Sequence, residues 1–175
     1  MGFKSLGRNV KISEKASVYD TDHITIGNNS RIDDFCVLSG KITIGSHVHI
    51  APFCLVAGGT EGIQLLDFAG LAYGVQVFTQ SDDYTGRTLT NPTVPDEFKL
   101  ETKRAVVIGR HVIVGASSLV FPGVILAEGC SVGAMSLVRK STDPWGVYIG
   151  NPAKRMKERK KDLLELEKRL LENDD

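Results

Sequence analysis

The sequence predicts an all-β solenoid, in which short strands stack in triangular coils around one core. The main observation is a period of six: an aliphatic residue stands at every sixth position from Ile26 to Val56 and again from Ile108 to Val138. Shorter runs, 6–18 and 65–77, bring the total to eighteen hexads. A helix repeats every 3.6 residues and a flat strand every two, so neither explains a strict period of six.

A longer repeat sets the shape of the coil. The motif Ile-Thr-Ile-Gly occupies residues 24–27 and returns eighteen positions later at residues 42–45. If each hexad is one strand with its corner, three hexads close a triangular coil, and eighteen hexads make about six coils. Position-one residues fill the core of such a coil. Neighbouring coils are expected to pair at the spacing of about 4.8 Å between hydrogen-bonded strands.

The composition excludes several classes of function. In 175 residues, 21 Lys and Arg balance 21 Asp and Glu, so the chain lacks the basic surplus that nucleic acids or acidic membranes attract. The length suits one domain. No run of eighteen apolar residues is present, and the N-terminus lacks the pattern of a secretory signal. We therefore expect a cytoplasmic protein without membrane insertion and without a nucleic-acid partner.

Three cysteines, Cys36, Cys54 and Cys130, occupy position five of their hexads. Their number is odd and no C-x-x-C pair is present, which fits neither a disulfide framework nor a structural zinc site. Because position five lines the core beside a corner, we predict that all three are reduced and buried.

Two segments depart from the hexad pattern. Residues 81–104 are predicted to leave the solenoid as a loop, because the step from Val77 to Ile108 is 25 residues longer than one hexad. Long loops are usually functional, so an active-site loop is the first interpretation and a trimer-packing arm the second. The solenoid domain is predicted to span residues 1–151. Residues 152–175 carry apolar side chains at helical spacing, which predicts a C-terminal helix.

Over most of residues 6–150 the hexads resemble those of the hexapeptide-repeat acyltransferases. Residues 132–140, followed by Gly-Asn-Pro-Ala-Lys at 150–154, look like the closing signature of the maltose, galactoside and xenobiotic acetyltransferase branch. The resemblance implies a left-handed parallel β-helix, a homotrimer, and acetyl-CoA bound as acyl donor between neighbouring subunits. The hand comes only from the resemblance, since the usual rule for parallel crossovers predicts the right-handed sense.

The same resemblance assigns a cofactor side of the site. It implies that Ala116 and Ala134 lie against the pantetheine arm, where small side chains leave room for a thin chain. It places five further residues at the nucleotide end of CoA: Arg139, Lys140, Pro152, Lys154 and Arg155. Cations suit the phosphates there, and solvated surface is the alternative for each basic residue.

The catalytic base is the point at which the chain departs from this family. Relatives carry a histidine shortly after a Tyr/Phe-Thr pair, and the matching position here is Asp82, within the segment 78–83. An aspartate is a weak base unless burial or a neighbouring charge raises its pKa, and Asp82 and Asp83 are close enough in sequence to repel each other. The alternatives are histidines that reach the site across the trimer: His49, His47 and, less strongly, His111.

A third route needs no strong base. An amino sugar with some neutral amine attacks a thioester unaided, and the carboxylates then orient it. Tyr84 and His47 are predicted to contact the acceptor. The segments 81–84 and 143–145 and the basic, leucine-rich tail resemble acetyltransferases of bacterial surface-polysaccharide (lipopolysaccharide and O-antigen) synthesis. This implies direct acetyl transfer, to oxygen or nitrogen, on a sugar or a nucleotide-linked amino sugar.

Two other functions are alternatives to acyl transfer. Zinc-dependent carbonic anhydrases use the same coils, but they need a paired H-x₄-H, and no two of the four histidines stand five residues apart. No metal is therefore expected. A non-catalytic scaffold or binding trimer is the second alternative, because a fold alone does not fix a function.

Overall fold

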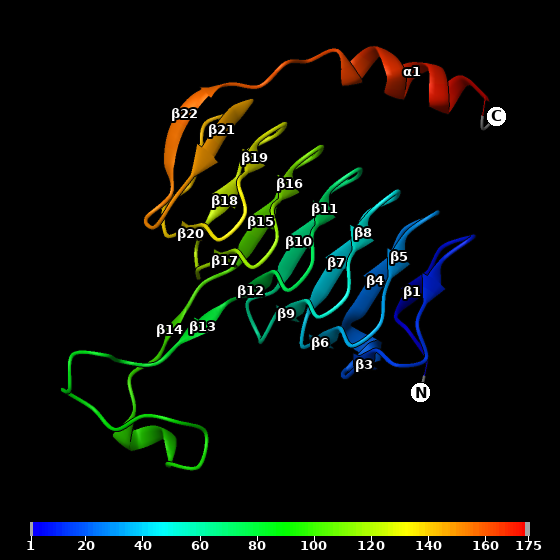
Figure 1. Cartoon of the computed structure of the whole chain (residues 1–175). Helices are drawn as coiled ribbons and strands as arrows, with labels where there is room; N and C mark the ends of the chain where they lie inside the picture. Colours follow the sequence, from blue (N-terminus) through cyan, green and yellow to red (C-terminus); the bar gives the residue numbers. More distant parts are fainter. Residues whose placement is uncertain (1, 174–175) are drawn as a thin grey trace.

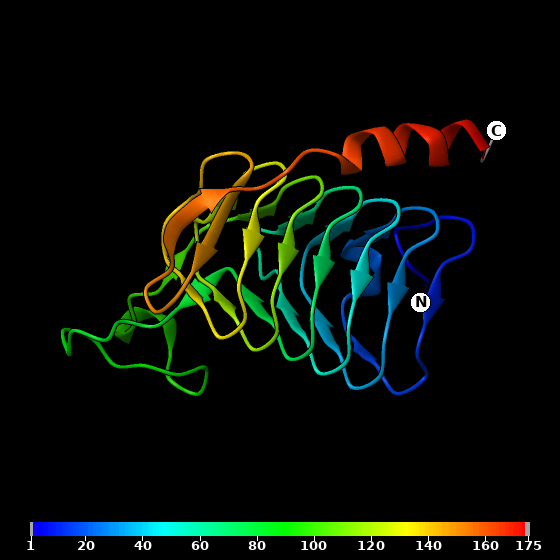
Figure 2. The same cartoon turned by 45° about the horizontal axis from the view of Figure 1, so that its top comes forward.

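The computed structural model describes residues 2–173. Three mainly parallel sheets form the sides of a triangular solenoid, a loop leaves it near the middle of the chain, and one α-helix follows the last coil (Figure 1). The chain takes one strand from each sheet in turn, so that each coil stacks on the previous one (Figure 2). The predicted all-β solenoid is confirmed.

Each side of the solenoid is one sheet of very short strands. The first sheet contains β1 (Ser5–Leu6), β4 (Ile24–Ile26), β7 (Ile42–Ile44), β10 (Ile63–Leu65), β15 (Val106–Ile108) and β18 (Ile125–Leu126). The second contains β2 (Lys11–Ile12), β5 (Arg31–Ile32), β8 (His49–Ile50), β11 (Gly70–Leu71), β16 (Ile113–Val114), β19 (Ser131–Val132), β21 (Gly146–Ile149) and β22 (Lys154–Glu158). The third contains β3 (Ser17–Val18), β6 (Val37–Ser39), β9 (Leu55–Ala57), β12 (Gln76–Phe78), β17 (Leu119–Val120) and β20 (Leu137–Val138). Six strands each in the first and third sheets make six complete coils within residues 2–173, as predicted, and β21 begins a seventh.

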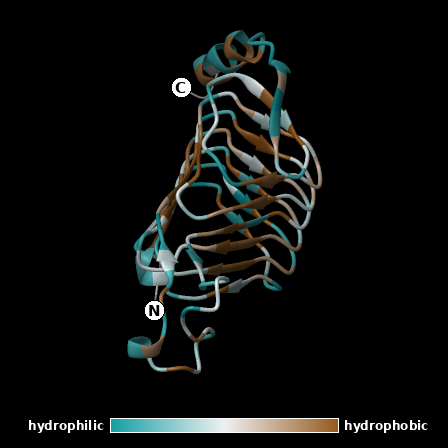
Figure 3. Cartoon of the chain, turned by 90° about the vertical axis from the view of Figure 1, so that its left-hand side faces the viewer, coloured by the Kyte–Doolittle hydropathy of each residue, from teal (hydrophilic) through white to brown (hydrophobic). Residues whose placement is uncertain are grey.

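The core is the triangular interior in which position-one residues meet. Strands one coil apart pair equivalent residues, as Ile26 does with Ile44. Every position-one side chain from Ile26 to Val138 is at most 3 % exposed, whereas Leu6 in the first coil is 52 % exposed because β1 pairs with one coil only. Figure 3 shows the hydrophobic segments concentrated in the stacked strands. The residues that recur every six positions are therefore the buried residues of the core.

The cysteines are buried and free, as predicted, and they also link neighbouring coils. Cys36 Sγ lies 3.1 Å from the carbonyl oxygen of Ala51, and Cys54 Sγ lies 3.1 Å from that of Ala72. The hydroxyl of Ser30 donates an equivalent bond of 2.8 Å. At these three position-five residues the thiol or hydroxyl thus donates to a carbonyl of the following coil, which satisfies a buried acceptor.

The corner between the first and second sheets carries an aromatic column. His47, Phe68 and His111 occupy equivalent turns with φ between 57° and 59°. Ring centroids are 4.7 Å apart between His47 and Phe68 and 5.2 Å between Phe68 and His111. One turn further, Gly129 leaves space for the ring of Trp145, because a Cβ there would lie 2.3 Å from that ring. Trp145 thus closes the column.

The prediction that a helix begins near residue 152 is wrong. Lys154–Glu158 form strand β22, which pairs antiparallel with β21 across a turn that contains Gly150 at φ 106°. β21 offers an open edge to the returning chain, and this main-chain pairing overrides the helical spacing of the apolar residues. The helix α1 spans Leu163–Asn173 and follows Asp162, a residue type favoured at helix starts. Within residues 2–173 no helix is long and apolar enough to cross a membrane.

Candidate active site

The long insertion leaves the solenoid through a short hairpin, here called the neck. The neck pairs β13 (Gln80–Ser81) with β14 (Thr102–Lys103) in antiparallel register. It stands where β12 ends, at the corner between the third and first sheets, and the chain re-enters the solenoid at β15 (Figure 1). The loop beyond the neck contains one 3-10 turn, η2 (Asp96–Phe98). A second 3-10 turn, η1 (Thr21–His23), precedes β4.

A cavity of about 720 Å³ lies between the loop and the third sheet. Its polar lining includes Asp82, Tyr84 and Glu101, and its apolar wall includes Leu55 of β9 and Phe78 of β12. The side chain of Tyr84 is 91 % exposed and is therefore open to a ligand. The structure brings together two residues predicted for the site, Asp82 and Tyr84. It adds Glu101, which the sequence analysis missed.

Asp83 organises the loop. Its carboxylate accepts hydrogen bonds from the backbone N–H and the hydroxyl of Thr85, at 2.9 and 2.7 Å, and from the backbone N–H groups of Arg87 and Thr88, at 3.1 and 3.2 Å. These bonds, that of the Thr85 hydroxyl foremost, lower the pKa of Asp83. A carboxylate held in this way is a poor proton acceptor, so its contacts argue against the predicted role of Asp83 as a base.

The predicted histidines lie on other surfaces of the chain. His49 stands on the exposed face of β8, and its Nε2 is 2.8 Å from Oδ2 of Asp33. Burial alone would raise the pKa of Asp33, but hydrogen bonds with His49 and Arg31 lower it overall. His47 belongs to the aromatic column. Within one chain neither histidine lines the cavity that contains Asp82.

His111, the weaker candidate, is buried under the C-terminal helix. Its Nε2 lies 2.8 Å from Oε2 of Glu167 on α1, and Arg110 forms an ion pair with the same carboxylate. Arg159 donates to the carbonyl oxygen of His111 at 2.6 Å. Burial, and then the charge of Arg110, lower the pKa of His111. These contacts make His111 an anchor for α1, remote from the neck.

We expect the stability of the fold to decrease as the pH falls below about 6.5, the ordinary pKa of histidine. Because the pKa of His111 is lowered on folding, the unfolded chain accepts this proton more readily than the folded one, so the contribution is present above that pH and is lost below it. Urea unfolding at about pH 7.5 and pH 5 should show a smaller pH-dependent loss for His111→Phe than for wild type. His23→Gln, at an exposed histidine, is the control. Equal pH dependence of His111→Phe and wild type contradicts the assignment.

The predicted cofactor side lies at the corner between the second and third sheets. Ala116 and Ala134 stand in consecutive coils, joined by a 2.8 Å hydrogen bond from the N–H of Met135 to the carbonyl oxygen of Ala116. Gly115 permits this approach, because a Cβ there would lie 2.5 Å from the backbone nitrogen of Ala134. Ala134 is exposed and Ala116 half-buried. The two methyl groups leave an open strip along the solenoid axis, which a thin pantetheine chain can follow.

Arg139 lies at the other corner of the third sheet, the one at which the neck stands. Arg139 follows β20, and its guanidinium carbon lies 6.0 Å from the ring centroid of Phe121. Phe121 packs against Phe78, a cavity residue, with centroids 5.1 Å apart. A line of side chains therefore runs along this corner from the acidic cavity to Arg139 near the last coil.

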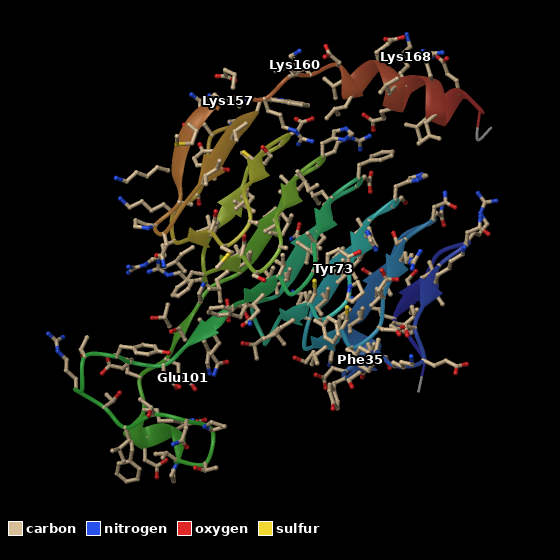
Figure 4. All side chains as sticks on the ribbon, in the orientation of Figure 1. Phe35, Tyr73, Glu101, Lys157, Lys160 and Lys168 are labelled. Carbon is tan, nitrogen blue, oxygen red and sulfur yellow. The ribbon has the colours of Figure 1, made fainter. Side chains whose placement is uncertain are left out.

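The remaining predicted cofactor residues surround the hairpin of β21 and β22. All four are exposed: Lys140, Pro152, Lys154 and Arg155. The peptide bond between Asn151 and Pro152 is cis. Figure 4 shows Lys157 and Lys160 on the same segment. This surface is cationic and suits phosphate groups. Among the residues that the structure describes, no group of three His, Cys, Asp or Glu is placed to hold a metal ion.

Comparisons with known proteins show the family of this chain. Residues 23–58 match the family described as bacterial transferase hexapeptide (six repeats). The dTDP-4-amino-4,6-dideoxy-D-glucose acyltransferase of Escherichia coli is 46 % identical over 170 residues, or 95 % of this chain and 88 % of that protein. AntD, an N-acyltransferase from Bacillus cereus solved in complex with dTDP and 3-hydroxybutyryl-CoA, is 47 % identical with a TM-score of 0.97, over 98 % of this chain and 92 % of its own. A maltose O-acetyltransferase from Clostridium difficile 630 shares the fold, at 23 % identity and a TM-score of 0.57 over 91 % and 71 % of the two chains.

Proposed function

The chain belongs to the hexapeptide-repeat family of acyltransferases, and from this premise we propose that it transfers an acetyl or similar short acyl group from CoA to the amine of a nucleotide-linked amino sugar. The observation that carries the proposal is the pairing of an acidic cavity with an open alanine corner along one sheet. The names and ligands of the two similar N-acyl and amino-sugar enzymes support this acceptor class. We place the reaction in the cytoplasm, where acyl-CoA and nucleotide sugars are made, and in surface-polysaccharide synthesis.

The proposed reaction is a direct transfer in a ternary complex. The neutral amine attacks the carbonyl carbon of the thioester, the C–N bond forms, the C–S bond breaks, and the amine proton passes to the departing CoA thiolate. Asp82 accepts a hydrogen bond from the amine and so holds the acceptor in the cavity, a contribution to acceptor binding. The three cysteines are buried, so none is accessible to form an acyl-enzyme intermediate.

We further propose that the site is completed in a homotrimer. In a cyclic trimer of triangular rods, one side of each rod faces the axis, and the two flanking corners meet the neighbouring subunits. The neck and the alanine corner flank the third sheet. A trimer with the third sheets inward therefore brings the neck of one subunit to the alanine corner of the next, which unites Asp82 with the CoA groove.

The outer face of the third sheet supports this arrangement. Its outward residues are largely apolar and pair along the stack, as Val37 does with Leu55 and Leu119 with Leu137. At the flanking corner, Phe35 and Tyr73 are 51 % and 64 % exposed (Figure 4). The outer faces of the other sheets carry several exposed polar residues in equivalent strands, including Arg31, Thr43, His49 and Gln64. An exposed apolar side of this kind is typical of a subunit interface.

We expect Asp82→Asn to impair amino-sugar binding more than chemistry. The loss of a charge-assisted hydrogen bond costs about 1.5–3 kcal/mol, so the KM for the acceptor should rise roughly tenfold to a hundredfold while kcat changes little. The measurement is thiol release from acetyl-CoA against nucleotide-linked amino sugars and plain sugars. Glu14→Gln, an exposed carboxylate in the first coil, is the control.

Two results contradict this proposal. Turnover with hydroxyl acceptors that collapses in Asp82→Asn identifies Asp82 as a general base of an O-acetyltransferase. Binding of acetyl-CoA without turnover on any acceptor indicates the alternative function, a scaffold or binding trimer.

A further inference from the structure

Glu101 is a largely buried carboxylate in the lining of the cavity between the loop and the third sheet. Its side chain is 10 % exposed, and it stands directly before β14, at the base of the loop (Figure 4). The residue lines the same cavity as Asp82. A buried anion is costly unless it is paired, so its partners show what it does.

The neck places Glu101 and Asp82 on one face. Gln80 pairs with Lys103 and Ser81 with Thr102, so the next pair outward in this register is Asp82 opposite Glu101. Because side chains alternate along a strand, the first and third of these pairs project to the same side. Two carboxylates opposite each other repel. Lys103 projects to the same side, two residues after Glu101 along the chain and diagonally across from Asp82.

Glu101 forms ion pairs with both lysines near it, Lys99 and Lys103. Lys103 Nζ lies 2.8 Å from one carboxylate oxygen of Glu101, and Lys99 Nζ lies 3.7 Å from the other. Lys99 is itself buried at 7 % exposure and also contacts Asp96 at 3.1 Å. The hydrogen bond with Lys103 lowers the pKa of Glu101 and raises that of Lys103. Glu101 is therefore a fixed anion and cannot act as the base.

The carboxylate of Asp82, by contrast, has no hydrogen bond or ion pair within the described residues 2–173. We propose that Glu101 is a positioning residue that occupies Lys99 and Lys103 and so keeps the Asp82 carboxylate available to the amine of the acceptor. The inference rests on the proposed function, which it deepens by naming the residue that controls Asp82. Without the charge on Glu101, the ammonium of Lys103 is free to pair with Asp82 and to compete with the substrate.

A pair of variants at the neck tests this role: the first removes the charge of Glu101, and the second also removes the charge of Lys103. Glu101→Gln should raise the KM for the amino-sugar acceptor about tenfold or more, while the KM for acetyl-CoA stays within about twofold of wild type, because one charge-assisted contact is lost on the acceptor side only. The double variant Glu101→Gln/Lys103→Met removes the freed cation. It should return the acceptor KM to within about threefold of wild type. Glu97→Gln, at an exposed glutamate in the same loop, is the control.

The outcomes separate the two proposals. A purely structural ion pair predicts that the double variant is at least as impaired as Glu101→Gln, and that result overturns the role of Glu101. Thermal unfolding of each variant shows whether the loop change destabilises the fold. If wild type transfers no acyl group to amino sugars, the proposed function fails, and the role of Glu101 fails with it.

Discussion

Ala134→Trp is expected to abolish acyl transfer while the solenoid stays folded. Ala134 is exposed at the corner between the second and third sheets, so an indole can be accommodated there without disturbing the core. It would fill the strip that we assign to pantetheine. Displacement of a substrate by as little as about 1 Å costs on the order of a hundredfold in rate, and we expect at least this loss.

The measurements are acetyl-CoA binding by calorimetry and thiol release with an amino-sugar acceptor. Glu14→Trp is a matched control. Glu14 occupies the equivalent corner position in the first coil, far from the two coils that contain Ala116 and Ala134. Normal transfer by Ala134→Trp would place the cofactor elsewhere on the molecule.

Leu119→Arg is expected to convert the proposed trimer into monomers and to remove activity with it. Leu119 projects from β17 on the apolar outer side of the third sheet, so a threefold axis there would bring three guanidinium groups together without counterions. Since the proposed site combines the neck of one subunit with the alanine corner of the next, transfer should fall by about a hundredfold or more.

Sedimentation velocity gives the oligomeric state of this variant. Thr43→Arg, on the exposed face of the first sheet, is the matched control and should remain trimeric and active. A fully active monomer of Leu119→Arg would show that one chain contains the complete site.

The features that the sequence predicted correctly are those set by local, repeated chemistry. Position-one residues such as Ile50 and Val114 are buried because every coil repeats the same environment. Asp83 is an exception, because we predicted a base, whereas its carboxylate accepts local hydrogen bonds from Thr85. A feature that depends only on a repeated arrangement of nearby residues can be predicted from the sequence alone.

The features that were missed depend on contacts between distant segments. His111 repeats the position of His47, yet α1 covers His111 with Glu167, which lies 56 residues away. Glu101 enters the cavity only because the register of the neck sets it opposite Asp82. Met156 shares its spacing with the leucines of α1 but lies in β22, where the pairing register with β21 shifts. In each case a long-range partner decided the outcome.

The reversal of direction between β21 and β22 also ends the second sheet. Each coil presents parallel edges on which the next coil pairs, but β22 runs the other way and carries exposed cations. By pairing with β21, β22 occupies the edge on which a strand of another coil would pair. The hairpin of β21 and β22 holds the cationic surface at a fixed distance from Ala116 and Ala134. The hairpin therefore fixes how far the exposed cations of β22 lie from these two alanines along the solenoid.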